Sequence, residues 1–305
     1  MASWQAYASA WLLKRRLKPR LRAARDILEL RRLLVPPAQK QPADVVINAA
    51  APGGVPGEWV RPREHDKGRL KLLYLHGGGY IACSAETHRP VTCFFGQLGF
   101  DVFAPNYRLA PEHVFPAAVE DAVAAYRAIS EGEDCPVLMA GDSAGGGLAV
   151  AAMLMLRDTG WSRMPAGAVL FSPWADLAAT GESLKTNNKK CALFDGAKLG
   201  PTARHYLAEA DPKTPLASPI YADLSALPPM LIHAAANETL LDDSRRLAAR
   251  ASEAGVDVTL KIWPVVPHCW QLMPEFVPEA RRSLREAGAF LMAAASKAGA
   301  VVDAS

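Results

Sequence analysis

Residues 139–149 read MAGDSAGGGLA, and the interpretation of the whole chain depends on this stretch. An apolar run leads into GDSAG at residues 141–145, and small residues then open a predicted helix. In this setting G-x-S-x-G places a serine on a sharp strand-to-helix turn, where the two glycines let neighbouring backbone approach. The pattern therefore predicts Ser143 as a catalytic nucleophile. The alternative is a glycine-rich helix start that only packs closely, whereas a phosphate loop is disfavoured because no Lys-Ser or Lys-Thr pair follows the glycines.

The second informative stretch is LLYLHGGGY at residues 72–80. A predicted strand ends at His76, and the three glycines that follow leave their backbone N–H groups unobstructed. Such donors, together with the N–H of Ala144, can stabilise the oxyanion of a tetrahedral intermediate, an effect of roughly 3 to 4 kcal/mol for each donor. His76 itself is expected to fix this loop, because the catalytic base should follow the acid nearer the end of the chain.

The stretch GGGYIA at residues 77–82 also fits G-x-G-x-x-A, the dinucleotide-binding fingerprint, and it too follows a predicted strand. That fingerprint needs an acidic residue that closes the next strand and holds the ribose. Asp101 has about the right separation, but it would open its strand. We therefore expect no nucleotide site at this loop.

A serine nucleophile needs a histidine base. Only His268 lies in a loop just beyond the last predicted strand and before the last predicted helix, where a base can reach over the sheet. It is the predicted base, and the alternative is a surface histidine beside Pro267. His233 lies within a predicted strand and is expected to be packed or at an edge. The histidines of the chain are His65, His76, His88, His113, His205, His233 and His268.

The stretch HAAANETLLDDSRR at residues 233–246 supplies three carboxylates that could orient this base. Glu238 follows the predicted strand at its carboxyl end, where loops converge on the serine, so it is the predicted acid. Asp242 and Asp243 stand at the start of a helix, where they are expected to cap free N–H groups and oppose the helix dipole. They remain alternatives for the acid, and Asp176, which follows another strand, is a more remote one.

The composition is that of an ordinary globular chain, and 305 residues that are 50% apolar fit one sizeable α/β domain with an attachment. A net charge of +3, with no long basic block apart from Lys14–Arg32, gives no electrostatic case for a nucleic-acid partner. The five cysteines are scattered without a CxxC pair, so we expect no disulfide framework, no thiolate metal site and a cytoplasmic protein. At the N-terminus the apolar residues precede the charged ones, which is the reverse of a secretory signal, and the apolar run is too short and interrupted to span a bilayer. We therefore expect neither translocation nor stable membrane insertion.

Short apolar runs alternate with helical stretches after residue 42, a pattern typical of a mostly parallel sheet covered on both faces. The first two runs, joined by the turn-rich APGGVPG, are expected to pair antiparallel. The last run, VDVTLKIWP, alternates cleanly and is expected to form a sheet edge, so a homodimer through this edge is a hypothesis. The predicted strands are 45–48, 58–61, 70–75, 102–105, 137–140, 168–171, 230–234 and 258–263, and the clearest predicted helices are 116–130, 146–158 and 243–254.

Two parts of the chain lie outside this alternation. Residues 3–34 carry aromatic and aliphatic residues at helical spacing with Lys and Arg between them, so one or two helices are expected to lie on the body of the protein. The alternative is a basic amphipathic helix on a membrane surface. Residues 174–228 show no convincing buried strand but do predict a helix near 196–210, and an insertion of that size is usually a lid over the catalytic end of a sheet.

These motifs together resemble the hormone-sensitive-lipase-like branch of the α/β-hydrolases, which includes many bacterial carboxylesterases. The resemblance rests on HGGG at 76–79, GDSAGG at 141–146 and NYRLAPEHVFPAAVEDAVAAYRAI at 106–129, and it spans about residues 70–272. It implies an α/β-hydrolase fold, with an eight-stranded, mostly parallel sheet, helices on both faces and a helical cap. The cap would come from N-terminal helices in residues 1–40 and from an insertion within about residues 176–222 of a catalytic domain spanning 41–305.

The resemblance also implies roles for particular residues. Arg108 and Glu112 would form a scaffold pair. The family usually has Asp-Pro-Leu where this sequence has Glu238-Thr239-Leu240, and a glutamate can fill the role because the loop can absorb one extra methylene. The oxyanion donors would be the N–H groups of Gly78, Gly79 and Ala144, with support from His76, Gly77, Asp142 and Gly145.

The implied activity is that of a serine carboxylesterase that acts on small-molecule esters with short to medium acyl chains. Ser143 would be the nucleophile, His268 the base and Glu238 the residue that orients the base, without a metal or an organic cofactor. The alternatives are a lactonase, an amidase or another acyl hydrolase with the same triad. A non-catalytic ligand-binding relative is disfavoured, because such relatives have lost the histidine and His268 is present.

Overall fold

The computed structural model describes residues 2–36, 41–64, 70–132 and 136–302 of the chain. Its centre is one eight-stranded sheet with the strand order β1-β2-β4-β3-β5-β6-β7-β8. β2 pairs antiparallel with both β1 and β4, and all other neighbouring strands are parallel. This arrangement confirms the predicted mostly parallel sheet and its antiparallel start. The strands are β1 Val45–Ala50, β2 Gly57–Pro62, β3 Lys71–Leu75, β4 Asp101–Pro105, β5 Val137–Asp142, β6 Ala168–Phe171, β7 Met230–Ala235 and β8 Val258–Trp263.

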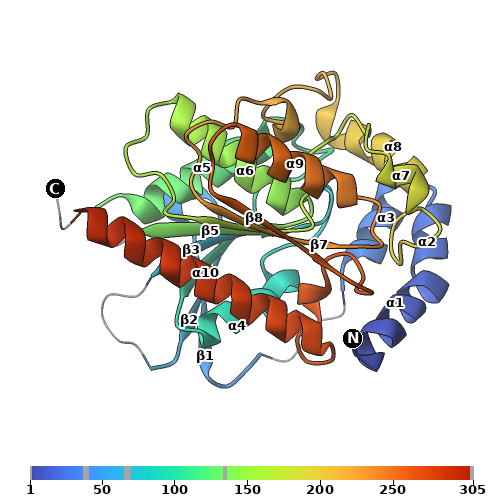
Figure 1. The fold of residues 1–305 in the computed structure, drawn as a ribbon, viewed down its shortest axis with the longest axis horizontal. Coiled ribbons are helices and arrows are strands. Elements are labelled where there is room, and N and C mark those ends of the chain that lie inside the picture. The colour runs from blue at the N-terminus through green and yellow to red at the C-terminus, as the bar shows by residue number, and fades with distance from the viewer. Residues whose placement is uncertain (1, 37–40, 65–69, 133–135, 303–305) are drawn as a thin grey trace.

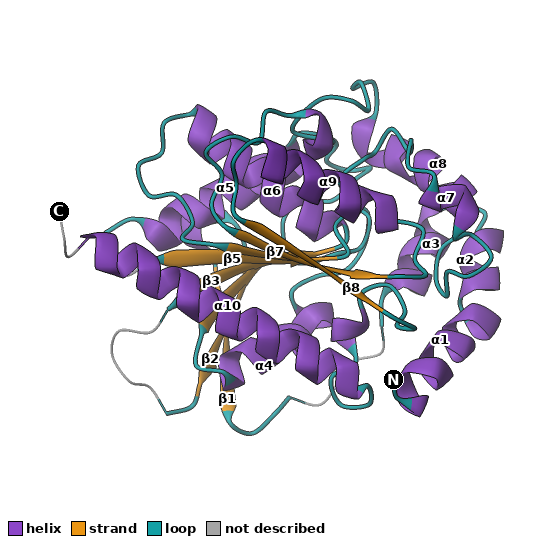
Figure 2. Cartoon of the chain, viewed as in Figure 1, coloured by secondary structure: helices purple, strands orange, loops and turns teal. Residues whose placement is uncertain are grey.

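Helices cover both faces of this sheet. α5, α6 and α9 lie on one face and α4 and α10 on the other, while α1 to α3 and α7 and α8 gather at one end of the molecule (Figures 1 and 2). The helices are α1 Trp4–Arg16, α2 Lys18–Ala23, α3 Ile27–Leu34, α4 Arg89–Gln97, α5 Ala117–Ser130, α6 Ala144–Asp158, α7 Ser183–Thr186, α8 Gly196–Leu207, α9 Leu241–Glu253 and α10 Pro278–Val302.

Two apolar cores hold the layers together, because successive side chains of a strand point to opposite faces. Leu73 of β3 joins the core under α5, α6 and α9, whereas its neighbour Leu72 joins the core under α4 and α10. Met139 and Leu138 of β5 divide between the two cores in the same way. Burial of each such side chain contributes roughly 1.5 to 3 kcal/mol. Strands that are buried on both faces therefore read as continuous apolar runs in the sequence.

β8 lies at the end of the strand order, which confirms the prediction that this strand forms a sheet edge. Its Thr259 and Ile262 side chains are exposed, and only Trp263 among its residues is buried. The other edge is β1. The backbone groups on the outer side of β8 therefore have no neighbouring strand among the residues that the structure describes.

The predicted pairing of Arg108 with Glu112 is wrong. The guanidinium of Arg108 binds Asp121 at 2.8 Å and Glu120 at 2.9 Å, both in α5. Glu112 instead pairs with Arg31 of α3. The loop after β4 carries Glu112 toward the N-terminal helices, while the Arg108 side chain follows the start of α5.

The turn between β5 and α6 brings backbone into close contact at Gly145. An added Cβ at this position would lie 2.0 Å from the carbonyl oxygen of Leu75 and 2.5 Å from that of His76. Neither atom belongs to a flexible side chain, so β3 and α6 could not both keep their places. Gly145 is therefore a structural requirement of the turn that carries Ser143.

We expect Gly145→Ala to lower the free energy of unfolding by about 2 to 4 kcal/mol, because overpacking against fixed backbone strains the turn. Gly299→Ala in α10 is the matched control, since an added Cβ there meets no atom within 4 Å. The control should be neutral or should raise stability by up to about 1 kcal/mol. Urea denaturation of the three proteins measures both effects, and equal stability of the two variants would contradict this interpretation.

Candidate active site

The backbone of Ser143 has an unusual conformation, with φ 51° and ψ −121°. Its N–H donates to the carbonyl of Phe171 at 2.8 Å, and its own carbonyl accepts from Trp174 N at 2.8 Å and Gly147 N at 3.2 Å. A non-glycine residue in such a conformation persists only where the surroundings fix it. β6 supplies the first of these bonds, the loop after it the second and α6 the third, so the position of the serine is set by the sheet as well as by its own turn.

The structure joins Ser143, His268 and Glu238 in one chain of hydrogen bonds. Ser143 Oγ lies 2.9 Å from His268 Nε2, and His268 Nδ1 lies 2.6 Å from Glu238 Oε2. All three residues are buried. A carboxylate can only accept, so Nδ1 carries the proton of this bond and Nε2 is left to accept from the serine hydroxyl. The imidazole is thus held in the tautomer that a general base requires.

Glu238 is fixed by its second carboxylate oxygen. Oε1 accepts from the backbone N–H of Ala235 at 2.9 Å, at the end of β7. The amide of Asn187, in the segment between β6 and β7, donates to the Glu238 carbonyl at 3.1 Å. Both oxygens of the carboxylate are therefore engaged, one with the strand end and one with the imidazole.

The two aspartates after Glu238 occupy other positions, and the prediction that they cap their own helix is wrong. Asp243 Oδ2 accepts from the N–H groups of Ala175 and Asp176, each at 2.9 Å, and Asp242 Oδ2 accepts from Ser183 N at 2.7 Å. Both lie in the first turn of α9, but their side chains reach the segment that follows β6. Burial, followed by the charge of Asp176, raises the pKa of Asp243 well above its usual range. These carboxylates fasten that segment to α9.

Asp176 is also engaged elsewhere. Its carboxylate accepts from Arg246 at 2.7 Å and from the hydroxyl of Thr180. Burial alone would raise the pKa of Asp176, but the hydrogen bonds from Thr180 and the charge of Arg246 lower it. No hydrogen bond joins it to His268 among the residues that the structure describes.

The backbone N–H groups of Gly78, Gly79 and Ala144 have no hydrogen-bond partner within the described part of the chain. Ala144 is the first residue of α6, so its N–H has no acceptor in the helix. Gly78 has φ +115°, and an added Cβ there would lie 2.1 Å from the Ala82 carbonyl oxygen. Only glycine fits this turn, which leaves the N–H groups of the loop available to a bound group.

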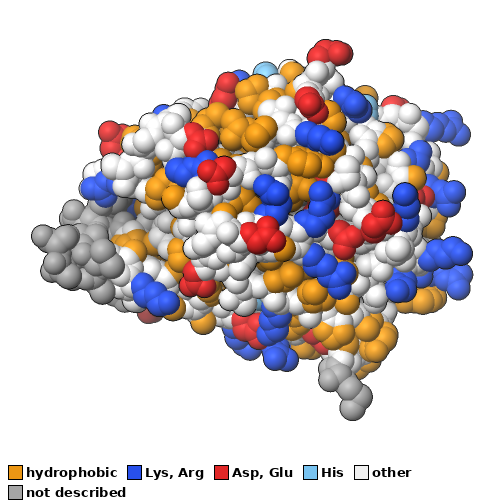
Figure 3. All heavy atoms as spheres, turned by 45° about the horizontal axis from the view of Figure 1, so that its top comes forward, with side chains coloured by type: hydrophobic (Ala, Val, Ile, Leu, Met, Phe, Trp, Pro, Cys, Tyr) orange, Lys and Arg blue, Asp and Glu red, His pale blue; other side chains and the backbone are white. Residues whose placement is uncertain are grey.

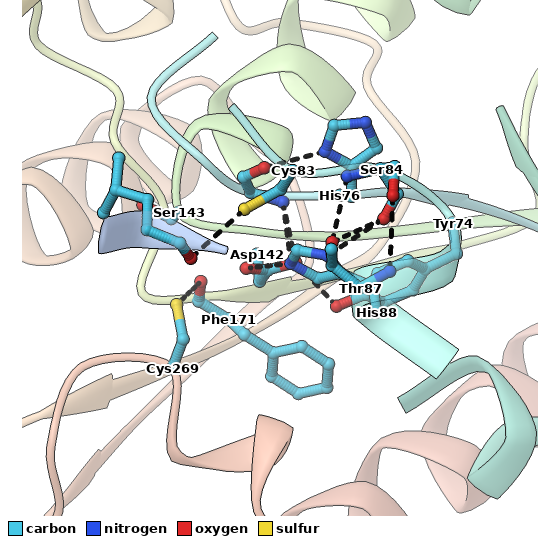
Figure 4. A network of polar contacts seen from close by, with 12 residues as sticks. Tyr74, His76, Cys83, Ser84, Thr87, His88, Asp142, Ser143, Phe171 and Cys269 are labelled. Carbon is cyan, nitrogen blue, oxygen red and sulfur yellow. Dashed lines mark hydrogen bonds and ion pairs between the residues drawn. The ribbon is translucent and has the colours of Figure 1, made fainter. Parts of the chain in front are cut away.

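The loop that carries Gly78 is tied to the serine turn through Asp142 (Figure 4). Asp142 Oδ1 accepts from the Tyr74 hydroxyl at 2.7 Å and from Gly77 N at 3.0 Å, and Oδ2 lies 3.3 Å from His88 Nε2. Burial alone would raise the pKa of Asp142, but His88 and the bond from Tyr74 lower it. Asp142 is therefore a buried carboxylate with several donors. Tyr74 and His88 were not predicted, because no local sequence pattern shows which buried polar groups meet.

His76 lies behind the same loop. Its ring stacks on Tyr107 with a centroid distance of 4.2 Å, and Nδ1 donates to the Gly77 carbonyl at 2.7 Å. Burial, assisted by the neighbouring His88, lowers the pKa of His76 to about 3, so the ring is neutral near pH 7. His233 is likewise packed within β7, where Nδ1 lies 2.8 Å from the Ser283 hydroxyl. Neither histidine contacts the serine.

The N-terminal helices and the segment between β6 and β7 both contact the catalytic end of the sheet. Arg31 of α3 donates to the Ile81 carbonyl at 2.5 Å and to the Ala110 carbonyl at 2.6 Å. Tyr206 of α8 stacks on Tyr80 at a centroid distance of 3.9 Å. Phe194, just before α8, meets the His268 ring edge to face at 5.1 Å. Sequence patterns did not indicate Arg31 or Phe194.

A dinucleotide site is not supported by this geometry. Asp101 is the first residue of β4 and pairs in register with Lys71, the first residue of β3. It therefore lies at the opposite end of the strands from Gly77, and its carboxylate pairs with Arg61 at 3.4 Å. An acid in that place cannot hold a ribose at the glycine loop.

A mostly parallel eight-stranded sheet with a serine on the turn after β5 and a histidine after β8 defines the class of α/β-hydrolases. Residues 72–272 match the model of a protein family that is described as alpha/beta hydrolase fold. The chain belongs to the hormone-sensitive-lipase branch of this class, a family of carboxylic ester hydrolases.

Several relatives are similar over most of the chain. An acetyl-hydrolase of Streptomyces hygroscopicus is 49% identical over 257 residues, which are 83% of each protein. An esterase of Acinetobacter venetianus is 34% identical and covers 78% of each. The crystal structure of an esterase from the bacterial hormone-sensitive lipase family has a TM-score of 0.88 at 38% identity, and covers 95% of this chain and 98% of that one. The agreement extends over both the sheet and its attachments.

Proposed function

We propose that this protein is a serine carboxylesterase that hydrolyses esters with short to medium acyl chains. The observation that carries the proposal is the hydrogen-bonded chain from Ser143 Oγ through His268 to Glu238, with distances of 2.9 and 2.6 Å. The N–H groups of Gly78, Gly79 and Ala144, which have no partner among the described residues, support it further. A nucleophile, an oriented base and oxyanion donors are the components that acyl transfer requires.

In the proposed first half-reaction, Ser143 Oγ attacks the acyl carbon while His268 Nε2 removes its proton. The carbonyl oxygen becomes an oxyanion, and the N–H groups of Gly78, Gly79 and Ala144 donate to it. Glu238 stays ionised and stabilises the imidazolium. When the tetrahedral intermediate collapses, the ester C–O bond breaks and His268 gives its proton to the departing alcohol.

In the second half-reaction, a water molecule replaces the alcohol. His268 removes a proton from the water as its oxygen attacks the acyl-enzyme carbonyl, and the same N–H groups bind the second oxyanion. Collapse then breaks the bond to Ser143 Oγ, which regains the proton from His268. The products are a carboxylic acid and the free enzyme.

We also propose that α1 to α3 and the segment around α7 and α8 form a cap over this site. Three kinds of contact support the proposal: the bonds of Arg31 to the Ile81 and Ala110 carbonyls, the stacking of Tyr206 on Tyr80, and the contact of Phe194 with His268. A roof this close to the serine limits the room for the acyl group. The acetyl-hydrolase relative supports the same preference.

The substrate range can be tested with p-nitrophenyl esters of increasing acyl length. We expect kcat/KM to be highest for short to medium chains and to fall for long ones, because the cap restricts the acyl pocket. Ser143→Ala is the blank and should reduce turnover by at least about 10⁴-fold. Full activity of this variant would refute the mechanism, and a matched set of lactones and anilides shows whether another acyl compound is preferred.

The assignment of the acid has its own test. Glu238→Gln should lower kcat by about 10³- to 10⁴-fold, since an amide no longer fixes the tautomer or stabilises the imidazolium. Asp242→Asn is the matched control: it should change kcat by only a few-fold and lower the melting temperature, because Asp242 binds the backbone of Ser183. A larger loss of kcat in the control would overturn the role given to Glu238.

We propose, finally, that two copies pair through β8. The outer side of this edge strand and its exposed Ile262 support the proposal. Light scattering coupled to gel filtration should give twice the chain mass of 32.7 kDa at micromolar concentration. Ile262→Lys should shift the mass toward one copy, because charge on an edge opposes pairing. A single-chain mass for the unmodified protein would exclude the dimer.

A further inference from the structure

Helix α1 turns large apolar side chains toward solvent. Trp4, Tyr7, Trp11 and Leu12 are 68%, 55%, 60% and 52% exposed, whereas Ala6 and Ser9 on the opposite side are buried. Phe276, 48% exposed, extends this surface and packs edge to face on Trp4 at a centroid distance of 5.8 Å. We call the exposed side chains of Trp4, Tyr7, Trp11 and Leu12 the aromatic face of α1. An exposed apolar patch of this kind is typical of a surface that binds a partner.

The same part of the chain concentrates positive charge. Residues 1–36 hold nine Lys and Arg but only two Asp and Glu, a net +7 in a chain whose total is +3, so the remainder carries a net −4. Lys14, Arg15, Arg16 and Arg20 are exposed and form no ion pair with any residue that the structure describes. These four residues and the aromatic face make up what we call the N-terminal surface.

Cationic residues of the neighbouring segment enlarge this basic region. Lys18 Nζ donates to the carbonyls of Asn188 and Cys191 at 2.5 and 3.0 Å, which brings the loop with exposed Lys189 and Lys190 against α2. In Figure 3, Lys and Arg side chains gather along the right-hand edge, the side on which Figure 1 places α1 to α3 and α7. Two segments far apart in the sequence thus present one cationic side of the molecule.

The N-terminal end of α1 is attached to α10, and the aromatic face of α1 points toward solvent. Ser3 caps the helix by accepting from Ala6 N, and its own N–H and hydroxyl donate to the two oxygens of Glu279 at 2.6 and 2.7 Å. The helix that carries the aromatic face is therefore in place before any partner arrives. Little ordering entropy would be lost on docking.

We propose that the N-terminal surface docks the protein onto an anionic lipid membrane. Tryptophan and tyrosine favour the boundary between headgroups and acyl chains, and Lys and Arg are attracted to the negative surface of such a bilayer. Among the described helices, none is both long and apolar enough to cross a membrane. The proposed interaction is adsorption of one face of the protein.

Other occupants fit this surface less well. A second copy that docked symmetrically would bring the same patch of each chain together, so the two +7 regions would repel. A nucleic acid would match the charge, but it would leave the aliphatic side chain of Leu12 and much of the aromatic area in water. An anionic bilayer satisfies both features at once.

Vesicle co-sedimentation of the full chain tests the proposal. The protein should bind vesicles of phosphatidylglycerol and phosphatidylcholine at low salt, bind those of phosphatidylcholine alone far more weakly, and dissociate as salt is raised. Tryptophan emission should shift to shorter wavelength on binding. Absence of binding to the phosphatidylglycerol vesicles at low salt would overturn the proposal, as would equal binding to both kinds of vesicle. The measurement is of bound protein, so it does not depend on the proposed esterase activity.

Two sets of substitutions separate the parts of the surface. Lys14→Gln, Arg15→Gln and Arg16→Gln together should weaken binding by about a hundredfold, at about 1 kcal/mol for each charge near the membrane. Trp4→Ala with Trp11→Ala should weaken it by at least about tenfold and should abolish the emission shift.

A matched control neutralises three exposed cations outside α1 to α3, at Lys213, Arg245 and Lys297. This control should bind as the unmodified protein does. Unchanged melting temperatures ensure that all the variants are folded. If the control lost as much affinity as the α1 variants, general charge and not the N-terminal surface would be responsible, and the proposal would fail.

Discussion

The carboxylate of Asp142 joins the two loops on which the proposed chemistry depends. β3 and β5 are neighbours in the sheet, and each ends in a loop at the same edge: one carries Gly78 and the other carries Ser143. A single Asp142 oxygen accepts from Tyr74 on β3 and from Gly77 in the glycine loop. Since the backbone of Asp142 continues directly into the serine, any shift of one loop is passed to the other. This one buried side chain therefore links the position of Ser143 to that of the glycine loop.

A buried carboxylate is costly unless donors surround it, and here that requirement organises much of the neighbourhood. Tyr74, His88 and the N–H of Gly77 all face Asp142, and His88 is held in turn by Thr87 and Ser84 (Figure 4). The second buried carboxylate, Glu238, is satisfied in the same manner by Ala235 N and His268. One carboxylate sets the geometry of the loops, and the other sets the tautomer of the imidazole.

Sequence patterns were sufficient for the sheet, because strands buried on both faces leave continuous apolar runs. The bounds of the predicted strands differ from the observed ones by at most two residues at either end. They also indicated Ser143, His268 and Glu238, since each follows the carboxyl end of a strand, where loops of a parallel sheet converge. They failed for side chains that bind backbone distant in sequence. Asp242 and Asp243 resembled helix caps but hold the segment after β6, and Arg108 binds α5 in place of Glu112. Tertiary packing determines which groups these side chains bind, and a local sequence pattern does not show that packing.

Arg31 bears on how proteins of this architecture could be recombined. This residue of α3 donates from its guanidinium to the carbonyls of Ile81 and Ala110 and to the carboxylate of Glu112. A chimaera that took its first 36 residues from a relative would leave these acceptors without a donor unless the incoming segment supplied an arginine at the same place. The N-terminal helices and the glycine loop would therefore have to be exchanged together, although about 40 residues of chain separate them.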